Sequence, residues 1–283
     1  MIPSRIRISV VIPVFNAAST IGRCAEALHA QRFPPESVEL IFVDDGSTDG
    51  CLESLALTRG TRLIRSDNHG AYAARNRGVA AASGDIIAFI DPDCIADPGW
   101  LAGIARAFDD AACEVALGVR RPCPDRGMNR MLGDYEATKD RWVIESGQPL
   151  KYYGYTNTMA VRRSAWERFG PFDERPRGAD TIFVRRAVDA AGCGSVRFVP
   201  EMLVSHLEVD GPCMYMKKVY TYGASSRRYG RVIRSEPLTT ADRMDVYWRT
   251  VRGGRYGPVR AITLALLLAM GSAVWTAGRL SVR

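Results

Sequence analysis

The chain of 283 residues is 47% hydrophobic and 24% charged, which is ordinary for a globular α/β protein and argues against a disordered or fibrous one. Its net charge of +7 is uneven: residues 217–260 hold eleven Lys or Arg against three acids, whereas residues 1–216 hold 25 basic and 28 acidic residues. The seven cysteines form no C-x-x-C pair, which argues against a disulfide framework or a zinc site and predicts reduced thiols in a cytosolic setting. The first ten residues lack the order of a signal peptide.

The first hundred residues predict alternating strands and helices. Strands are expected at 8–16, 38–43, 61–65 and 86–90, and helices at 17–30, 51–58 and 71–82, with Asn16 or Ser19 available to cap the first helix. Right-handed crossovers join elements that alternate at this spacing. We therefore expect a Rossmann-like, mostly parallel sheet flanked by helices on both faces.

The stretch at 86–90 organises this half of the chain. Its five apolar residues, rich in Ile and Phe, predict a strand buried on both faces, and Pro92 ends the hydrogen-bonded ladder. Asp91 and Asp93 follow at once, and two carboxylates this close repel each other unless a cation or a proton lies between them. Mg2+ or Mn2+ holding a diphosphate is the most economical occupant. A solvated turn with an aspartate at a helix N-cap is the alternative that the spacing leaves open.

Polar residues follow each of the four expected strands, at 15–16, 44–45, 67–68 and 91–93. The carboxyl ends of parallel strands meet at one edge of a sheet, so these loops predict a crevice of the size of a nucleotide. The chain has neither a G-x-G-x-x-G fingerprint after the first strand nor a G-x-x-x-x-G-K loop. Hydride transfer and ATP hydrolysis therefore lose their usual phosphate-binding loops.

Five short motifs occur in order along this part of the chain: Val-Val-Ile-Pro-Val-Phe-Asn at 10–16, Val-Asp-Asp-Gly-Ser-Thr-Asp at 43–49, Asn-x-Gly and Ala-Arg-Asn-x-Gly within 68–78, Gly-Asp-x-x-x-Phe-x-Asp-x-Asp at 84–93 and Gly-Trp-Leu at 99–101. Together they resemble the motifs of nucleotide-sugar-dependent glycosyltransferases of family 2, which have the GT-A fold. The resemblance covers about residues 8–210. It implies an inverting enzyme that uses a divalent metal.

The resemblance implies a nucleoside site at the ends of the first two strands. Phe15, Asn16 and one of Asp44 or Asp45 would hold the base and the ribose, and Pro13 belongs to the same substrate-binding stretch. A carboxylate there accepts the imide N–H of a uracil or the hydroxyls of a ribose. A turn with an aspartate as helix cap remains the alternative for 44–47.

The resemblance also implies a site for the diphosphate and the sugar. Arg75 would reach the nucleotide, because a guanidinium offers a fork of donors that suits phosphate. Asp93 would bind the metal, with Asp91 near the sugar or the ribose. His206 would complete the metal and diphosphate site, although a histidine between apolar residues is also typical of a protein core.

The second half is less regular. A strand is expected at 115–119, and a helix or a mobile loop at 128–142. The aromatic residues at 152–155 predict either core packing or a surface on which a sugar stacks. Gly192 and Gly194 suggest a helix C-cap followed by a strand. The stretches 156–163, 166–174 and 178–186 resemble the second half of the same family. Asp180 would then be the general base. The family usually has Glu before it, and Ala179 stands there; an ordinary N-cap is the alternative for Asp180.

The C-terminal part predicts a helix at 213–228 beside or over the site, followed by eighteen uncharged residues at 261–278. As a helix these span about 27 Å, slightly less than the ~30 Å of a bilayer's hydrocarbon core. The arginines before them favour the cytoplasmic face of a cell membrane over a nucleic acid. Whether the segment crosses the membrane, lies on it or packs in a homodimer stays open.

These observations predict two regions: a GT-A domain at 1–212, with a nucleotide-binding half at 1–100 and an acceptor half at 101–212, and a basic helical tail at 213–283. The expected activity is transfer of one sugar, from a UDP-sugar by preference, to a glycan or lipid-linked acceptor in cell-surface glycan or glycolipid synthesis. The Q-x-x-R-W segment of processive synthases is absent after Asp180. A non-catalytic member that only binds nucleotide sugars is the alternative.

Overall fold

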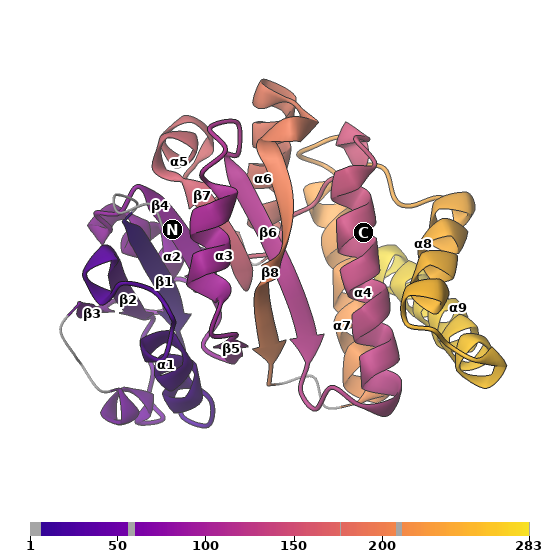
Figure 1. The fold of residues 1–283 in the computed structure, drawn as a ribbon, viewed down its shortest axis with the longest axis horizontal. Helices are drawn as coiled ribbons and strands as arrows, with labels where there is room; N and C mark the ends of the chain where they lie inside the picture. Colours follow the sequence, from indigo (N-terminus) through magenta and orange to yellow (C-terminus); the bar gives the residue numbers. More distant parts are fainter. Residues whose placement is uncertain (1–6, 56–59, 176, 208–210, 283) are drawn as a thin grey trace. The chain divides into compact units, whose positions relative to one another are not determined.

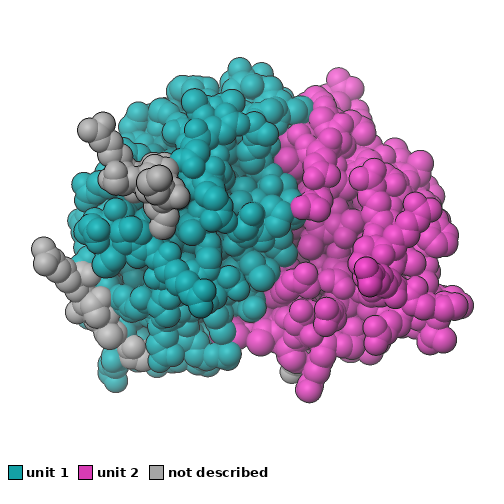
Figure 2. Space-filling view, in the orientation of Figure 1, with its two compact units in different colours: residues 1–119, 153–205 teal, residues 120–152, 206–283 magenta. Residues whose placement is uncertain are grey.

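The computed structural model describes residues 7–55, 60–175, 177–207 and 211–282. Its internal contacts divide the chain into two compact units, coloured separately in Figure 2. Unit 1 comprises Met1–Val119 and Tyr153–Ser205, and unit 2 comprises Arg120–Tyr152 and His206–Arg283. Residues 120–152 therefore belong with the C-terminal residues, while a domain boundary after residue 212 stays a prediction.

In the described part of the chain, one eight-stranded sheet has the order β3-β2-β1-β4-β7-β6-β8-β5 (Figure 1). Strands β1 to β4 pair in parallel, whereas β7 is antiparallel to both β4 and β6. The strands are β1 Ile8–Val14, β2 Val38–Asp44, β3 Thr61–Arg65, β4 Ile86–Ile90, β5 Cys94–Ala96, β6 Val115–Pro122, β7 Thr158–Arg162 and β8 Val196–His206. The sheet is thus parallel in its first half and mixed as a whole, and the strands predicted in the first half are confirmed.

Strand β4 lies inside the sheet, between β1 and β7. All five of its residues are buried, as are all seven of β1. A strand with neighbours on both edges and helices on both faces has no contact with water, which explains why this stretch is free of charges. The loop after β4, with Asp91 and Asp93, therefore starts from a fully buried strand inside the sheet.

The helices of unit 1 are α1 Ile21–His29, α2 Ala71–Ala81, α3 Trp100–Ala107, α5 Arg163–Phe169 and α6 Ala179–Ala191. Helix α6 ends at Gly192 and is followed by β8, as the two glycines indicated. A short 3-10 helix, Cys51–Ser54, lies where the helix 51–58 was expected, and residues 56–58 of that expectation lie outside the described residues.

The prediction that Asn16 or Ser19 caps the first helix was wrong. Helix α1 begins at Ile21 with Thr20 at its N-cap, and no side chain makes a capping hydrogen bond. The side chain of Asn16 instead accepts a hydrogen bond from the backbone N–H of Thr48, 2.9 Å away. A contact across 32 residues has therefore taken the place of the local cap.

Helix α2 lies very close to the sheet. A Cβ atom added at Gly78 would collide with the side chain of Val11 on β1 and would lie 3.1 Å from Val43 on β2. Only glycine permits this approach of the helix backbone to the two strands. Gly78 thus sets the distance between α2 and the strands whose ends carry the candidate site.

Apart from the ends of β6 and β8, unit 2 is mainly helical where it is described. Its longer helices are α4 Gly127–Glu145, α7 Pro212–Tyr229, α8 Thr240–Gly253 and α9 Pro258–Leu280 (Figure 1). The stretch 128–142 is thus a helix, and the helix predicted at 213–228 is confirmed. Helix α8 was not predicted from the sequence, although Thr239 and Asp242 form a reciprocal capping box at its start.

Candidate active site

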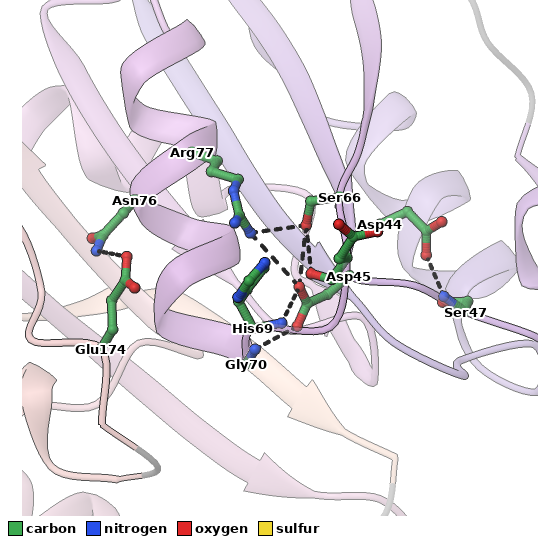
Figure 3. Close-up of polar contacts among 10 residues, drawn as sticks. Asp44, Asp45, Ser47, Ser66, His69, Gly70, Asn76, Arg77 and Glu174 are labelled. Atoms are coloured by element: carbon green, nitrogen blue, oxygen red, sulfur yellow. Dashed lines mark hydrogen bonds and ion pairs between the residues drawn. The ribbon is translucent and has the colours of Figure 1, made fainter.

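Asp45, just after β2, fixes the loop that leads into α2 (Figure 3). Its carboxylate accepts hydrogen bonds from the Ser66 hydroxyl at 3.1 Å, the His69 N–H at 3.0 Å and the Gly70 N–H at 2.7 Å. Asp45 is also only 3% exposed. Both of its oxygens therefore have partners inside the protein, and its structural role is to set the position of the 66–70 loop.

Asp44, the last residue of β2, has fewer partners. Its Oδ1 accepts a hydrogen bond from the Ser47 N–H at 3.0 Å (Figure 3). The Ser47 hydroxyl in turn accepts one from the N–H of Asn16 at the same distance. Phe15 is 48% exposed beside this connection, whereas Pro13 is buried within β1. The ends of β1 and β2 thus form one hydrogen-bonded edge that presents an exposed aromatic ring.

Arg75, on α2, is 5% exposed and contacts Asp91 after β4. One of its guanidinium nitrogens lies 2.5 Å from Asp91 Oδ1, and the guanidinium carbon lies 5.4 Å from the centre of the Tyr72 ring. Its buried Nε has no hydrogen-bond partner in the described part of the chain. Arg75 therefore holds Asp91 and keeps one buried donor to spare.

Asp180 lies in the first turn of α6, whose N-cap is Gly178 with a positive φ of 92°. The alternative of Asp180 as an ordinary N-cap is therefore wrong. The carboxylate accepts a hydrogen bond from the Thr181 N–H at 2.8 Å and another from the Tyr72 hydroxyl. That hydroxyl in turn accepts a hydrogen bond from the Gly178 N–H at 3.3 Å. Tyr72 thus holds the start of α6 from α2.

The environment of Asp180 raises its pKa above the ordinary value for an aspartate. Removal of the carboxylate from water is the main cause, and the negative charge of Asp91 adds to it. The hydrogen bonds from Thr181 and Tyr72 and the charge of Arg75 oppose the shift without cancelling it. A carboxylate with a raised pKa binds a proton more readily, which is the property required of a general base.

A third residue of α2, Asn76, binds the loop before α6. Its amide nitrogen donates to the Phe172 carbonyl at 2.9 Å, and its amide oxygen accepts from the Phe172 N–H at 3.0 Å. A weaker contact of 3.4 Å reaches Glu174 (Figure 3). The ring of Phe172 packs on Phe89 of β4, with 5.3 Å between ring centres. The loop is thereby fixed both to the helix and to the sheet.

Tyr72 and Asn76 are functional residues that the sequence analysis missed. Tyr72, Arg75 and Asn76 are spaced i, i+3, i+4 and so lie on one face of α2. This face holds three separate segments: Gly178 and Asp180, Asp91, and Phe172. Polar residues at helical spacing directly after a glycine loop were the available signal, but their partners lie about a hundred residues away in the sequence.

The residues after β4 have a donor set that suits a hard cation. Asp91 and Asp93 are half-buried and offer carboxylate oxygens. The neighbouring thiols of Cys24 and Cys94 have strongly raised pKa values, chiefly because they are buried and also because the charges of Asp93 and Asp91 lie nearby. Without a metal these thiols therefore stay protonated, and the carboxylates are the anionic groups of the loop. Oxygen ligands of this kind fit Mg2+ or Mn2+.

The remaining predicted site residues lie as follows. His206 is the last residue of β8 and belongs to unit 2, where its Nε2 lies 3.3 Å from Nζ of Lys218. Within unit 1, Tyr155 is buried and donates to the Gly118 carbonyl at 2.7 Å; within unit 2, Tyr152 is buried and donates to the Ile144 carbonyl at 2.5 Å. Core packing of these two rings, one of the two interpretations of 152–155, is thus confirmed.

Residues 9–174, more than half of the chain, match Glycosyl transferase family 2, and the chain belongs to this family. It is therefore a glycosyltransferase with a GT-A-type fold, as the five motifs predicted. Glycosyltransferase AglE of Haloferax volcanii is 31% identical over 219 residues, which are 71% of each chain. The pre-mycofactocin glycosyltransferase of Mycobacterium tuberculosis is 32% identical over 218 residues, 72% of this chain and only 43% of that protein.

Solved structures show the same fold. A mannosyltransferase from Pyrobaculum calidifontis, PcManGT, in complex with GDP-Man and Mn2+, superimposes with a TM-score of 0.58 at 21% identity over 95% of this chain and 76% of its own. Glucosyl-3-phosphoglycerate synthase from Mycobacterium tuberculosis, in complex with Mn2+ and UDP-Glc, gives 0.55 at 21% identity over 80% and 79% of the two chains.

Proposed function

We propose that this glycosyltransferase transfers one sugar from a nucleotide-sugar donor to an acceptor hydroxyl with inversion at the anomeric carbon. One observation carries the proposal: a single face of α2 holds both the acidic loop after β4, through Arg75, and the start of α6, through Tyr72. The residues expected at the donor phosphates and the residue expected to act as base thus share one support. The complexes of the two solved relatives support a nucleotide-sugar donor and a divalent metal.

The donor's nucleoside lies at the ends of β1 and β2. Phe15 offers an exposed ring on which a base stacks, Asp44 offers its second carboxylate oxygen as an acceptor, and Asn16, whose Oδ1 is bound to Thr48, offers its amide N–H groups as donors. Asp45 is left out of this contact because the 66–70 loop occupies its oxygens. A uracil base, and hence a UDP-sugar, remains the favoured donor.

The diphosphate lies at the loop after β4. Asp93 and His206 would hold the divalent metal there, Mg2+ or Mn2+, and the metal when bound neutralises charge that develops on the diphosphate leaving group. Arg75 keeps Asp91 in place and has a buried Nε–H without a partner among the described residues. Asp91 contacts the sugar or the ribose.

Asp180 takes the proton from the acceptor hydroxyl. As the O–H bond breaks, the acceptor oxygen forms a bond to the anomeric carbon on the face opposite the nucleotide, and the bond to the diphosphate oxygen breaks. The configuration inverts in this single displacement, and no covalent enzyme intermediate forms. The acceptor is a glycan or a lipid-linked hydroxyl at the cytoplasmic face of a membrane.

The substitution Asp180→Asn tests this assignment. It removes the base and keeps the size of the side chain, so we expect transfer to fall about 10²–10⁴-fold while nucleotide affinity changes little. Asp109→Asn, at an exposed position after α3, is the matched control and should retain full activity. Unchanged turnover of the Asp180→Asn enzyme would remove Asp180 from the mechanism.

A non-catalytic nucleotide-sugar-binding protein is the second candidate, because Ala179 stands where the family usually has Glu. A thermal-shift panel of UDP, GDP and dTDP sugars with Mn2+ or EDTA gives the first discrimination. Metal-dependent stabilisation by one nucleotide, followed by sugar transfer to an acceptor, supports the enzyme. Stabilisation without hydrolysis or transfer to any acceptor supports the binding protein instead.

A further inference from the structure

Helix α9 of unit 2 has two different faces. Leu264, Leu267, Gly271 and Gly278 are buried along one side. The opposite side is exposed and contains Val259, Ile262, Leu266 and Met270, whose exposed fractions range from 48% to 78%. From Ala261 to Gly278 the helix carries no charge. An apolar, uncharged and exposed helix face of this length is typical of a site that binds a partner.

The buried side of α9 is bound to α7 by a very close contact (Figure 1). A Cβ atom at Gly223 of α7 would collide with the Trp275 carbonyl of α9, and one at Gly278 of α9 would collide with the Tyr220 carbonyl of α7. The two backbones thus touch, which only glycine allows at these positions. Helices α7 and α9 therefore form a fixed pair within unit 2.

Helix α7 cannot enter the hydrocarbon of a bilayer at low cost. It carries Lys217, Lys218, Arg227 and Arg228. It is also bound to α4 by a hydrogen bond of 2.9 Å from the Tyr215 hydroxyl to Glu136. A membrane-spanning α9 would have to leave α7 or take these charges with it, and intramembrane charges are strongly disfavoured. This argues for a helix that lies along a membrane surface.

The charges around α9 indicate which surface it meets. Residues 246–283 contain no acidic residue, and Arg252, Arg255 and Arg260 precede the apolar stretch while Arg279 follows it. On the neighbouring α8, Trp248 is 47% exposed. Arginines and an exposed tryptophan beside an apolar helix face are the composition of an amphipathic anchor on anionic lipid.

We propose that the exposed face of α9 docks on an anionic lipid bilayer and lies in the plane of its surface, with α7 still bound to the other face. This proposal deepens the proposed function, because it would bring the enzyme to a lipid-linked acceptor. It makes no use of the catalytic residues, so membrane binding is measured without donor or acceptor, and failure of one proposal leaves the other intact.

The test is sedimentation of the full chain with vesicles of phosphatidylcholine alone or with one quarter phosphatidylglycerol. We expect the chain to bind the anionic vesicles. Binding to the neutral vesicles, and binding to the anionic vesicles in high salt, should each be at least tenfold weaker. Ile262→Glu/Leu266→Glu should lower binding at least tenfold. Met128→Glu, which places a charge on an exposed methionine of α4, is the matched control and should bind like the unchanged chain.

A second measurement separates a helix on the surface from one that spans. In a Cys213→Ser background, cysteines placed at Gly257 or at Ser281, just beyond the two ends of α9, are treated with an impermeant thiol reagent added outside sealed vesicles. Labelling at both positions supports the proposal, and labelling at one alone shows a span and overturns it. The proposal is also overturned if the double glutamate variant binds vesicles as strongly as the unchanged chain. It is overturned as well if the unchanged chain binds no vesicles and the double glutamate substitution instead converts a dimer to a monomer.

Discussion

Helices α2 and α9 are both placed by glycines, yet their free faces are opposite in character. Gly78 brings α2 onto β1 and β2, and the other face of α2 carries polar side chains that hold three loops of unit 1. Gly278 brings α9 onto α7, and the other face of α9 is apolar and exposed. The first face has its partners inside the chain, whereas the second lacks any in the described structure and is suited to one outside it.

The largest change that would break the α2 side of this comparison is Arg75→Ala. It leaves Asp91 without its partner, at a carboxylate whose side chain is 27% exposed, so we expect a loss of about 3 kcal/mol in the free energy of unfolding. The measurement is chemical denaturation. Arg106→Ala, which removes a pair exposed to 58% and 54%, should cost about 0–1 kcal/mol. Equal costs for the two variants would show that the Arg75 contact adds nothing to stability.

A smaller loss of stability is expected from a substitution at the contact between α9 and α7. Gly278→Ala places a methyl group against the Tyr220 carbonyl, so the pair of helices must separate, with an expected loss of about 1–3 kcal/mol. Gly271→Ala is a matched substitution in the same helix, where the new methyl group meets the end of the Met216 side chain, with its sulfur at 3.9 Å and its terminal carbon at 4.0 Å. It should be neutral or stabilise by about 0.5–1 kcal/mol through helix propensity. Thermal unfolding compares the two, and equal melting temperatures would contradict the close contact.

The smallest expected effect is a shift in the pH dependence of kcat when Tyr72, on the polar face of α2, is replaced. If Asp180 is the base, as proposed, activity requires its ionised form, so kcat is full above the pKa of this carboxyl and falls as the pH drops through it. Burial raises that pKa, so the fall should begin above the range of an ordinary aspartate. Tyr72→Phe removes a hydrogen bond that lowers the pKa, and the fall should therefore move to still higher pH.

The control for Tyr72→Phe is Asn76→Ala, on the same face of α2. Asn76 contacts Phe172 and Glu174, so its loss should reduce stability without moving the acid side of the pH profile. A profile that shifts equally in both variants would mean that α2 acts on Asp180 only through general packing.

The strands of the parallel half were predictable from the sequence because their signal is local. The run at 86–90 is apolar and charge-free, and Asp91 and Asp93 mark its end without reference to any other part of the chain. Gly192 is likewise a local signal, because a glycine is typical of the residue that ends a helix, and it stands at the end of α6. The family, too, could be read from short motifs in a fixed order.

The contacts that assemble the site could not be predicted because they join distant residues. Tyr72 binds Gly178 across 106 residues, and Asn76 binds Phe172 across 96. Nothing beside either residue in the sequence indicates its partner. The wrong cap at Asn16 has the same origin, since a long-range contact with Thr48 displaced the local one. The role of Asp180 remains a prediction that Asp180→Asn tests. The roles of Asp93 and His206 remain predictions, and the thermal-shift panel with Mn2+ or EDTA tests the metal dependence that they imply.

The support of two carboxylates by one helix has a consequence for how the enzyme tolerates change. If α2 shifts on the sheet, through heat or through a substitution under Gly78, Arg75 and Tyr72 shift with it. The contacts of Asp91 and Asp180 with α2 then change together, although β4 and α6 still hold the backbones of these two residues. A single substitution in α2 should therefore disturb both carboxylates at once, which a site supported by two independent helices would avoid.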